Sequence, residues 1–305
     1  YATGDNSFAF GDSAMATGYG SYAFGSIGMD EFGTFTGNPA IAAGDFSFAF
    51  GNGANADSLG SVALGTNTLA SNRFAMALGH SSAASGELSN ALGFYANASG
   101  AMSTAIGYSP DATGYGSIAI GQHALADGSN AIAIGYDVHS SGWASIAMGW
   151  ETDATMDVAF SSGERTLASG FASTAMGGFS TASGNYSFTT GYYTRATGNY
   201  STAMGREIEA AGLYSFGISL NNPATLYTIS DDNTIAIMGG EVGIGTVSPD
   251  KTLHVVGDAR VTGDIYYGAG ATVYTKPDFV FSGDYNNRYG ILEVEKFISE
   301  NNHLP

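Results

Sequence analysis

The chain has 305 residues, with 45 glycines, no cysteine, and 27 acidic against nine basic residues, so its formal charge is −18. This charge repels phosphate groups and argues against binding to nucleic acid or to an anionic membrane surface. The absence of cysteine excludes disulfides and thiolate metal sites and fits an extracellular location, and no apolar run is long enough for direct membrane insertion.

A glycine recurs every fourteen residues over the first two thirds of the chain. These closing glycines, which we interpret as structural corners, are Gly51, Gly65, Gly79, Gly93, Gly107, Gly121, Gly135, Gly149, Gly163, Gly177, Gly191 and Gly205. Gly11, Gly25 and Gly37 are assigned to the same series, with one twelve-residue spacing. So short a period indicates stacked units that contact mainly their neighbours. Tyr1 lies inside a repeat, so we expect the chain to be part of a longer protein.

A second glycine lies seven residues before most closing glycines, as Gly114 does before Gly121. Asn72 takes this place once, and asparagine is the non-glycine residue that most readily adopts left-handed backbone. The pattern therefore predicts a second left-handed corner in each unit. Glycine at such a spacing argues against a helix, because each one costs about 1 kcal/mol relative to alanine.

Side chains alternate in the segment that precedes each closing glycine. In one unit Ser117 and Ala119 are small, whereas Ile118 and Ile120 are apolar and large. A period of two predicts a strand, and the recurrence of the same residue types predicts parallel strands stacked in register. An alanine nine residues before the closing glycine, such as Ala112, indicates a tightly packed second strand.

A single column of such units encloses little volume and leaves an apolar or alanine-rich face in water. Large apolar patches are rare on soluble monomers, so we expect self-association around the long axis. Three chains form the most natural closed arrangement, and twofold packing is the alternative. End-to-end joining into a filament is a further expectation that composition leaves open.

The units resemble the YadA-like head repeat of trimeric autotransporter adhesins. The motifs that carry the resemblance are Ser61-Val-Ala-Leu-Gly65, Ser117-Ile-Ala-Ile-Gly121, Ala131-Ile-Ala-Ile-Gly135 and Ser145-Ile-Ala-Met-Gly149. The resemblance covers residues 1–219 and implies a left-handed parallel β-roll, a homotrimer and adhesion. Two units depart from it, at 159–163 and 187–191, where polar residues replace apolar ones. We expect these units to be looser or to hold water.

The repeat pattern breaks after residue 219. Turn signals at 221–223 and 231–233 separate short alternating segments at 225–229 and 234–238. The stretch 241–265 is similar to a connector in phage tail fibres and large bacterial surface proteins, and 279–305 resembles the C-terminal region of secreted Bacteroidetes-type surface proteins. Ile291, Val294 and Ile298 have helical spacing and predict a helix that begins a short coiled coil. We therefore divide the chain into a shaft (1–219), a neck (220–278) and a C-terminal segment (279–305).

No residue pattern predicts a catalytic site, a cofactor or a metal site. His80, His123 and His139 lie one, two and four places after a closing glycine, so they are not expected to stack into one metal site. Serine is abundant but has no paired base. Glu207 and Glu209 are the nearest approach to the carboxylate pair of a glycoside hydrolase, which needs two carboxylates about 5–10 Å apart.

Aromatic side chains recur at an exposed corner. The place just after the closing glycine carries Phe94, Tyr108, Tyr136, Trp150 and Tyr192. A second series five residues before the closing position holds Tyr186, Tyr200 and Tyr214. One interpretation is stacking along the rod or within a trimer interface. The other is a binding platform for a glycan or a receptor protein, because amphipathic aromatic residues favour recognition surfaces.

Together these patterns predict an all-β, left-handed parallel β-roll, or β-solenoid, that is trimeric, with a β-rich neck and a short C-terminal helix. The predicted function is that of a non-enzymatic adhesive fibre at the cell surface, which binds a glycan or a host-surface receptor without a cofactor. One alternative is a phage or injection-system tail fibre. An alternative of another class is a polysaccharide-degrading spike built on a β-solenoid.

Overall fold

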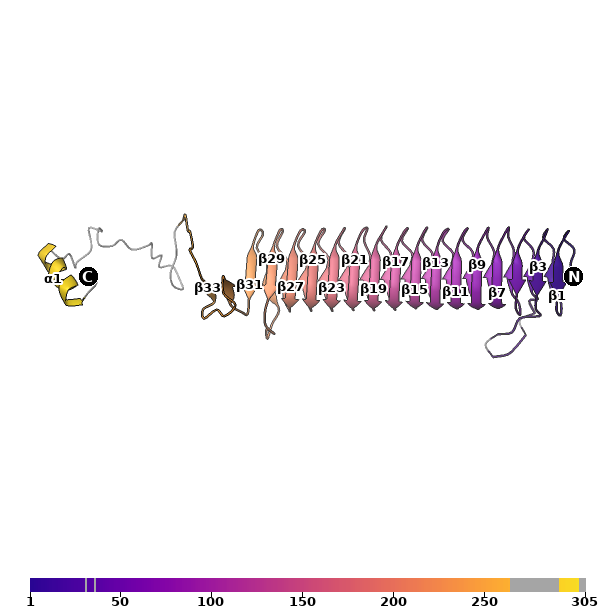
Figure 1. The fold of residues 1–305 in the computed structure, drawn as a ribbon, viewed down its shortest axis with the longest axis horizontal. Helices are drawn as coiled ribbons and strands as arrows, with labels where there is room; N and C mark the ends of the chain where they lie inside the picture. The colour runs from indigo at the N-terminus through magenta and orange to yellow at the C-terminus, as the bar shows by residue number, and fades with distance from the viewer. Residues whose placement is uncertain (31, 36, 264–290, 302–305) are drawn as a thin grey trace. The chain divides into compact units, whose positions relative to one another are not determined.

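A computed structural model describes residues 1–263 and 291–301, except residues 31 and 36. The chain divides into two compact units, Tyr1–Gly240 and Glu241–Pro305. The first unit is an all-β parallel solenoid, and Figure 1 shows the strands of one of its sheets side by side in a row. The predicted fold class, a parallel β-solenoid with fourteen-residue coils, is confirmed.

Within the described residues, the coils of the solenoid contribute strands to two parallel sheets, a long-strand sheet and a short-strand sheet. The long-strand sheet has 16 strands: β1 (Phe8–Phe10), β3 (Tyr22–Phe24), β5 (Phe48–Phe50), β7 (Val62–Thr66), β9 (Met76–His80), β11 (Asn90–Phe94), β13 (Thr104–Tyr108), β15 (Ile118–Gln122), β17 (Ile132–Tyr136), β19 (Ile146–Trp150), β21 (Phe160–Glu164), β23 (Thr174–Gly178), β25 (Phe188–Tyr192), β27 (Thr202–Arg206), β29 (Phe216–Ser219) and β31 (Ile235–Met238).

The short-strand sheet has 15 strands within the same described residues. They are β2 (Met15–Ala16), β4 (Ile41–Ala42), β6 (Asn55–Ala56), β8 (Leu69–Ala70), β10 (Ala83–Ala84), β12 (Asn97–Ala98), β14 (Asp111–Ala112), β16 (Leu125–Ala126), β18 (His139–Ser140), β20 (Asp153–Ala154), β22 (Leu167–Ala168), β24 (Thr181–Ala182), β26 (Arg195–Ala196), β28 (Ile208–Ala210) and β30 (Tyr227–Ile229). In both sheets each strand pairs with the equivalent strand of the next coil.

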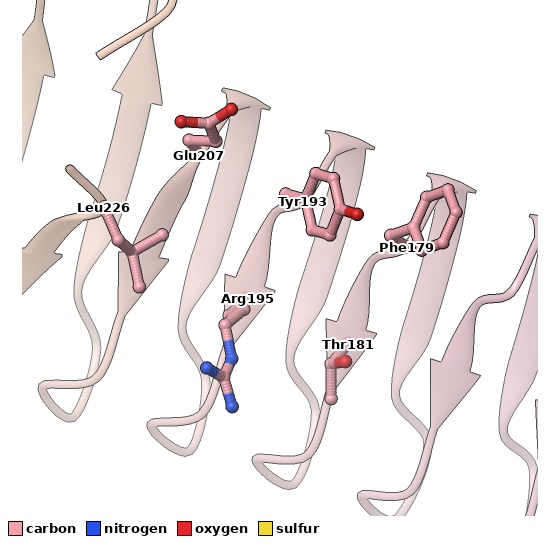
Figure 2. A pocket seen from close by; sticks show the side chains of 6 residues that line it. All are labelled: Phe179, Thr181, Tyr193, Arg195, Glu207 and Leu226. Carbon is pink, nitrogen blue, oxygen red and sulfur yellow. The ribbon is translucent and has the colours of Figure 1, made fainter. Parts of the chain in front are cut away.

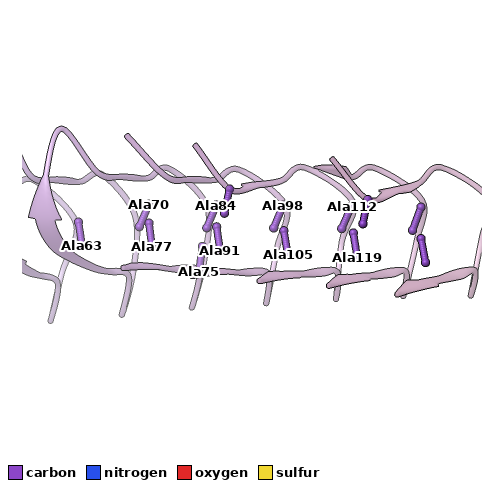
Figure 3. Close-up of a cluster of buried hydrophobic side chains, with 14 of the residues drawn as sticks. Ala63, Ala70, Ala75, Ala77, Ala84, Ala91, Ala98, Ala105, Ala112 and Ala119 are labelled. Atoms are coloured by element: carbon purple, nitrogen blue, oxygen red, sulfur yellow. The ribbon is translucent and has the colours of Figure 1, made fainter. Parts of the chain in front are cut away.

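The pairing is in register, so equivalent residues of successive coils lie above one another. Ala119 is the Cα partner of Ala133, and Gly121 is the partner of Gly135. A fourteen-residue coil with two strands has little room inside, so most interior side chains are small, and the larger Ile208 is accommodated opposite Gly217. Ser117, Ala119 and Ala112 are all fully buried. Figure 3 shows the resulting columns of alanine side chains, with those of the short-strand sheet facing those of the long-strand sheet.

Most closing glycines lie within the long strands, as Gly121 does in β15, and their backbone explains why glycine is needed there. Gly121 has φ +129°, and a Cβ atom there would lie 2.0 Å from the carbonyl oxygen of Gly135. The prediction of a left-handed corner at the second glycine was wrong. Gly114 has no positive φ, but a Cβ would lie 2.0 Å from the carbonyl oxygen of Gly128. Glycine is favoured there by the close approach of two coils, and the left-handed residue is two places later, at Gly116 with φ +64°.

The assignment of Gly37 to the closing series was also wrong. Tyr22 pairs with Phe48, so 26 residues separate these neighbours instead of 14. Gly25 therefore stacks on Gly51, whose carbonyl oxygen would be 1.9 Å from an added Cβ. A Cβ on Gly37 would meet nothing within 4 Å. Gly37 thus belongs to a loop inserted between two coils, and its spacing from Gly51 is coincidental.

The solenoid continues past the point where the sequence pattern breaks. Phe216 pairs with Ile235, a separation of 19 residues, so five extra residues are accommodated in the coil. The two strands predicted near 225–229 and 234–238 are present as β30 and β31, and they extend the two sheets to Met238. Both sheets therefore extend beyond the last repeat motif. The division into shaft, neck and C-terminal segment stays a prediction.

The second unit has little regular structure among its described residues. Two short strands, β32 (Val242–Ile244) and β33 (Leu253–Val255), pair in parallel. The predicted helix is present as α1 (Ile291–Asn301). Residues 264–290 and 302–305, which include most of the predicted C-terminal segment, lie outside the described residues. Within the described part, none of the helical structure has the length and apolarity needed to cross a bilayer.

The two coils with polar substitutions contain paired hydroxyl groups in the interior. Ser161 and Thr166, both buried, lie 2.7 Å apart through their hydroxyl oxygens. Thr189 donates likewise to Thr194, which also lies 2.8 Å from the Ser180 hydroxyl. A buried hydroxyl is stabilising only when it is hydrogen-bonded. These coils are therefore matched in polarity across the interior, which argues against the looseness expected from sequence.

A neighbouring coil lacks this match. The buried Thr152 hydroxyl has no hydrogen-bond partner among the described residues, because the position that Ser161 occupies in the next coil is Ala147 here.

We expect Ala147→Ser to raise the free energy of unfolding by about 1 kcal/mol, because it supplies a hydrogen-bond partner for Thr152. Conversely, Ser161→Ala should lower it by about 1–3 kcal/mol, because Thr166 is left unpaired. Thermal and urea unfolding of both variants would measure the changes, and shifts of the same sign would contradict the pairing.

Candidate functional site

The outer side of the long-strand sheet is an apolar surface. Because small side chains fill the interior, the large ones that alternate with them point away from it. Those more than a third exposed are Phe8, Phe10, Tyr22, Phe50, Met76, Ile106, Ile134, Met148, Ile235 and Ile237. Their strands pair in register along the sheet. We call this surface the apolar face; nothing in the described chain covers it.

The aromatic residues after the closing glycines include one stacked pair and do not form a continuous ladder. The rings of Phe94 and Tyr108 are stacked, with centroids 5.3 Å apart and planes 6° apart. Tyr136 and Trp150 are Cα partners on adjacent strands. Tyr192 packs edge-on against Tyr193, and the Arg206 guanidinium lies 5.2 Å from its ring centroid. All except Phe94 are more than 40% exposed in the single chain, so they are available for contact with another molecule.

The second aromatic series is a true stack. The ring centroids of Tyr186 and Tyr200 are 5.1 Å apart, and those of Tyr200 and Tyr214 are 4.9 Å apart, with nearly parallel planes. All three residues have φ between 56° and 57°. They therefore occupy the left-handed corner of each coil, and the strain of that backbone is offset by ring stacking, worth about 0.5–1.5 kcal/mol per pair.

A pocket of about 440 Å³ lies near this end of the solenoid, and sequence reasoning missed it. Its lining residues are Phe179, Thr181, Tyr193, Arg195, Glu207 and Leu226. Figure 2 shows Phe179, Tyr193 and Glu207 on successive coils, with Thr181 and Arg195 on the short strands that follow Phe179 and Tyr193, and Leu226 at one end. The rings of Phe179 and Tyr193 are stacked, with centroids 4.8 Å apart. We call this site the Arg195 pocket.

Two arginines lie beside the pocket, and one of them, Arg165, lies over a ring of the stack. Arg165 forms an ion pair with Glu151 and lies 5.5 Å from the ring centroid of Phe179. Arg206 forms an ion pair with Glu207, with 3.3 Å between nitrogen and oxygen. The charge of Glu207 is thus partly compensated beside the pocket, and its second carboxylate oxygen is free of this contact.

A more acidic pocket of about 380 Å³ lies further along the same side. Its lining includes His123, Asp137, His139, Glu151 and Asp153. The structure thus brings two histidines together that the sequence analysis had separated, because positions two and four of adjacent coils are neighbours. No three histidine or carboxylate groups in the described residues are arranged to hold a metal ion.

Electrostatics within the acidic pocket centre on His139. Its Nε2 lies 3.1 Å from an oxygen of Asp127, and its Nδ1 lies 4.0 Å from an oxygen of Asp153. Partial burial raises the pKa of Asp153 above its ordinary value, and the nearby His139 offsets part of that rise. The three groups thus form a small polar cluster at the surface.

The two glutamates considered for glycoside hydrolysis have different roles. Glu207 is the left-handed residue before β28, with φ +50°, and it pairs with Arg206. Glu209 is on β28 itself and accepts a hydrogen bond of 3.2 Å from the Thr197 hydroxyl. Both carboxylates therefore make contacts that support the surface structure.

Comparison with known families agrees with the coil geometry. The model of the YadA head domain repeat matches residues 2–26, 37–54, 42–68, 56–82, 84–109, 112–137, 168–188 and 190–207, which together cover more than half of the chain. The chain belongs to the YadA head repeat family. YadA head repeats occur in surface adhesins, a structural class. No curated protein matches the chain.

The matches also leave gaps that the structure fills. Between residues 137 and 168 the family model does not match, yet β18, β19, β20 and β21 continue both sheets without interruption. That interval contains one of the two coils with hydroxyl pairs in place of alanine. The YadA head matches end at residue 207, so the resemblance of 241–265 to a connector stays a prediction.

Proposed function

We propose that this chain is the shaft or head of a non-enzymatic adhesive fibre on a cell surface, and that it works as a homotrimer. The observation that carries the proposal is the apolar face. Ile106, Ile134 and Met148 are each 37–38% exposed in the single chain, on strands that all face the same way. A stripe of this length on a soluble protein indicates an interface, because water contact with so much apolar surface is unfavourable.

Three chains suit this geometry. Packing the apolar faces around one axis closes the assembly, whereas an open arrangement would leave further apolar edges. The short-strand sheets and the pockets then remain at the outside. Membership of a family of trimeric surface adhesins supports the same arrangement and an extracellular location.

Adhesion would follow from repetition rather than from one strong site. Each chain presents the aromatic groups at Phe94 and Tyr108, at Tyr136 and Trp150, and at Tyr192. Three parallel copies multiply every such group, so several weak contacts with a surface glycan or receptor act together. Linked contacts raise the overall affinity by a factor of about 10²–10⁴ when the geometry permits simultaneous binding.

Native mass spectrometry tests the assembly directly. We expect a particle of three times the chain mass of 31.1 kDa. Electron microscopy of the same sample should show a narrow rod. A monomer at micromolar concentration would contradict the proposed trimer, and a dimer would support the twofold alternative.

A further inference from the structure

The surroundings of the Arg195 pocket differ in charge from the rest of the chain. The whole chain carries 27 acidic residues and a formal charge of −18. Residues 165–206 nevertheless contain no aspartate or glutamate and hold Arg165, Arg195 and Arg206. Over the three coils of this range the charge along the chain is reversed, although Glu151 and Glu207 outside the range pair with Arg165 and Arg206 and leave Arg195 as the unpaired positive group. This reversal coincides with the aromatic stacks at Phe179 and at Tyr186.

Among these arginines, Arg195 is the one whose charge is not paired. Arg165 and Arg206 each form an ion pair with a glutamate, as does Arg73 near the other end of the solenoid. Within the described residues Arg195 has neither an ion pair nor a hydrogen bond. Its Cα partner Glu209 instead accepts a hydrogen bond from Thr197. The exposed guanidinium of Arg195 thus keeps all its donors for a ligand.

The lining of the pocket combines apolar walls with polar groups, as a sugar combines apolar C–H groups with hydroxyl groups. Phe179, Tyr193 and Leu226 give apolar walls, and Thr181, Arg195 and Glu207 give polar groups (Figure 2). A volume of about 440 Å³ falls in the range of about 300–1,000 Å³ typical of small-ligand sites. We propose that the Arg195 pocket binds a carboxylate-bearing sugar residue, a uronic acid, of a surface polysaccharide. This inference rests on the proposed adhesive function and names the ligand class of one site.

The chemistry assigns a role to each group. A guanidinium and a carboxylate form two parallel hydrogen bonds, which fixes the orientation of the sugar. The Thr181 hydroxyl and the free oxygen of Glu207 can bond sugar hydroxyl groups, and the apolar C–H groups of the sugar pack on the walls. The acidic remainder of the rod provides no long-range attraction for an anionic ligand. Recognition therefore depends on the single short-range contact with Arg195 and not on total ligand charge.

Isothermal titration calorimetry on the full chain tests this inference. The probe is a hyaluronan tetrasaccharide, which carries glucuronic acid, and the control probe is its carboxyl-reduced form, which has the same shape without the charge. We expect the charged probe to bind at least tenfold more tightly. Arg195→Gln should weaken its binding at least tenfold, whereas Arg195→Lys should weaken it less. The matched control is Arg73→Gln, which removes another surface arginine and should leave binding unchanged.

The outcomes separate this inference from the proposed assembly. Native mass and thermal unfolding of each variant show whether the rod has formed. If trimers form but the charged probe does not bind, or binds equally to the Arg195→Gln protein, the pocket assignment is overturned and the fibre proposal stands. If the chain is monomeric yet binds the probe through Arg195, the pocket assignment stands and the trimer fails.

Discussion

Replacement of Gly121 by alanine is expected to disrupt the coil that this glycine closes. The residue has φ +129°, which L-residues rarely adopt, and an added Cβ would lie 2.0 Å from the backbone oxygen of Gly135. Rotation of a side chain can relieve neither the unfavourable φ nor the contact with Gly135, because both involve backbone atoms. We expect the free energy of unfolding to fall by about 3–5 kcal/mol, among the largest effects of a single substitution. Urea unfolding followed by circular dichroism would measure it.

Gly116 provides the matched control, only five residues away. It also has a positive φ, +64°, but a Cβ there would meet the side chain of Asn130 and not backbone. Asn130 itself has φ +57° at the equivalent position of the next coil. Gly116→Asn should therefore change stability by about 0.5 kcal/mol or less. Equal losses for the two variants would show that the close contact between coils is not what requires glycine at position 121.

The repeat made much of the fold predictable from sequence. Identical residue types every fourteen positions can pair only in register, so the partners Ala119 and Ala133 followed from the period. Sequence could not tell a glycine that needs left-handed backbone from one that needs a close approach. Gly114 belongs to the second kind, and the left-handed place beside it is often bulky, as at Tyr186 and Tyr200.

Inserted loops were the second source of error. Gly37 lies fourteen residues before Gly51 and therefore fitted the period, although it is outside the coil. The loop in which it lies is held by its own contacts, since the Asp30 carboxylate accepts hydrogen bonds from the backbone of Phe32 and Thr34. Spacing alone gives no sign of such an insertion when its ends happen to match the period.

One candidate site could be predicted from the sequence and the other could not. The series from Phe94 to Tyr192 shares one position of the repeat and was visible in the sequence. The Arg195 pocket combines Tyr193 and Arg195, which occupy different positions, with Leu226, which follows a five-residue insertion. The absence of acidic residues over 165–206 was a signal that could have pointed to it.

The sequence also left open which face of the column meets water. The structure decides this, because the narrow interior is filled mainly by alanine, serine and threonine, so the isoleucines that alternate with them on the long strands point outward. Ile134 is 38% exposed and stacks between Ile120 and Met148 of the neighbouring coils.

We expect Ile134→Glu to leave the single chain folded and to abolish trimer formation. Three carboxylates would be brought into an apolar interface without partners, which costs several kcal/mol each.

Native mass and sedimentation velocity would measure this effect as a change from three chains to one, with the trimer dissociation constant raised at least 100-fold. The matched control is Leu167→Glu, the same change in polarity on the short-strand sheet. Leu167 also points away from the interior, but on the side that we expect to face solvent. If Leu167→Glu dissociates the trimer and Ile134→Glu does not, the interface lies on the short-strand sheet, and the Arg195 pocket would then be at the contact between chains. The two variants together therefore locate both the interface and the surface left free for adhesion.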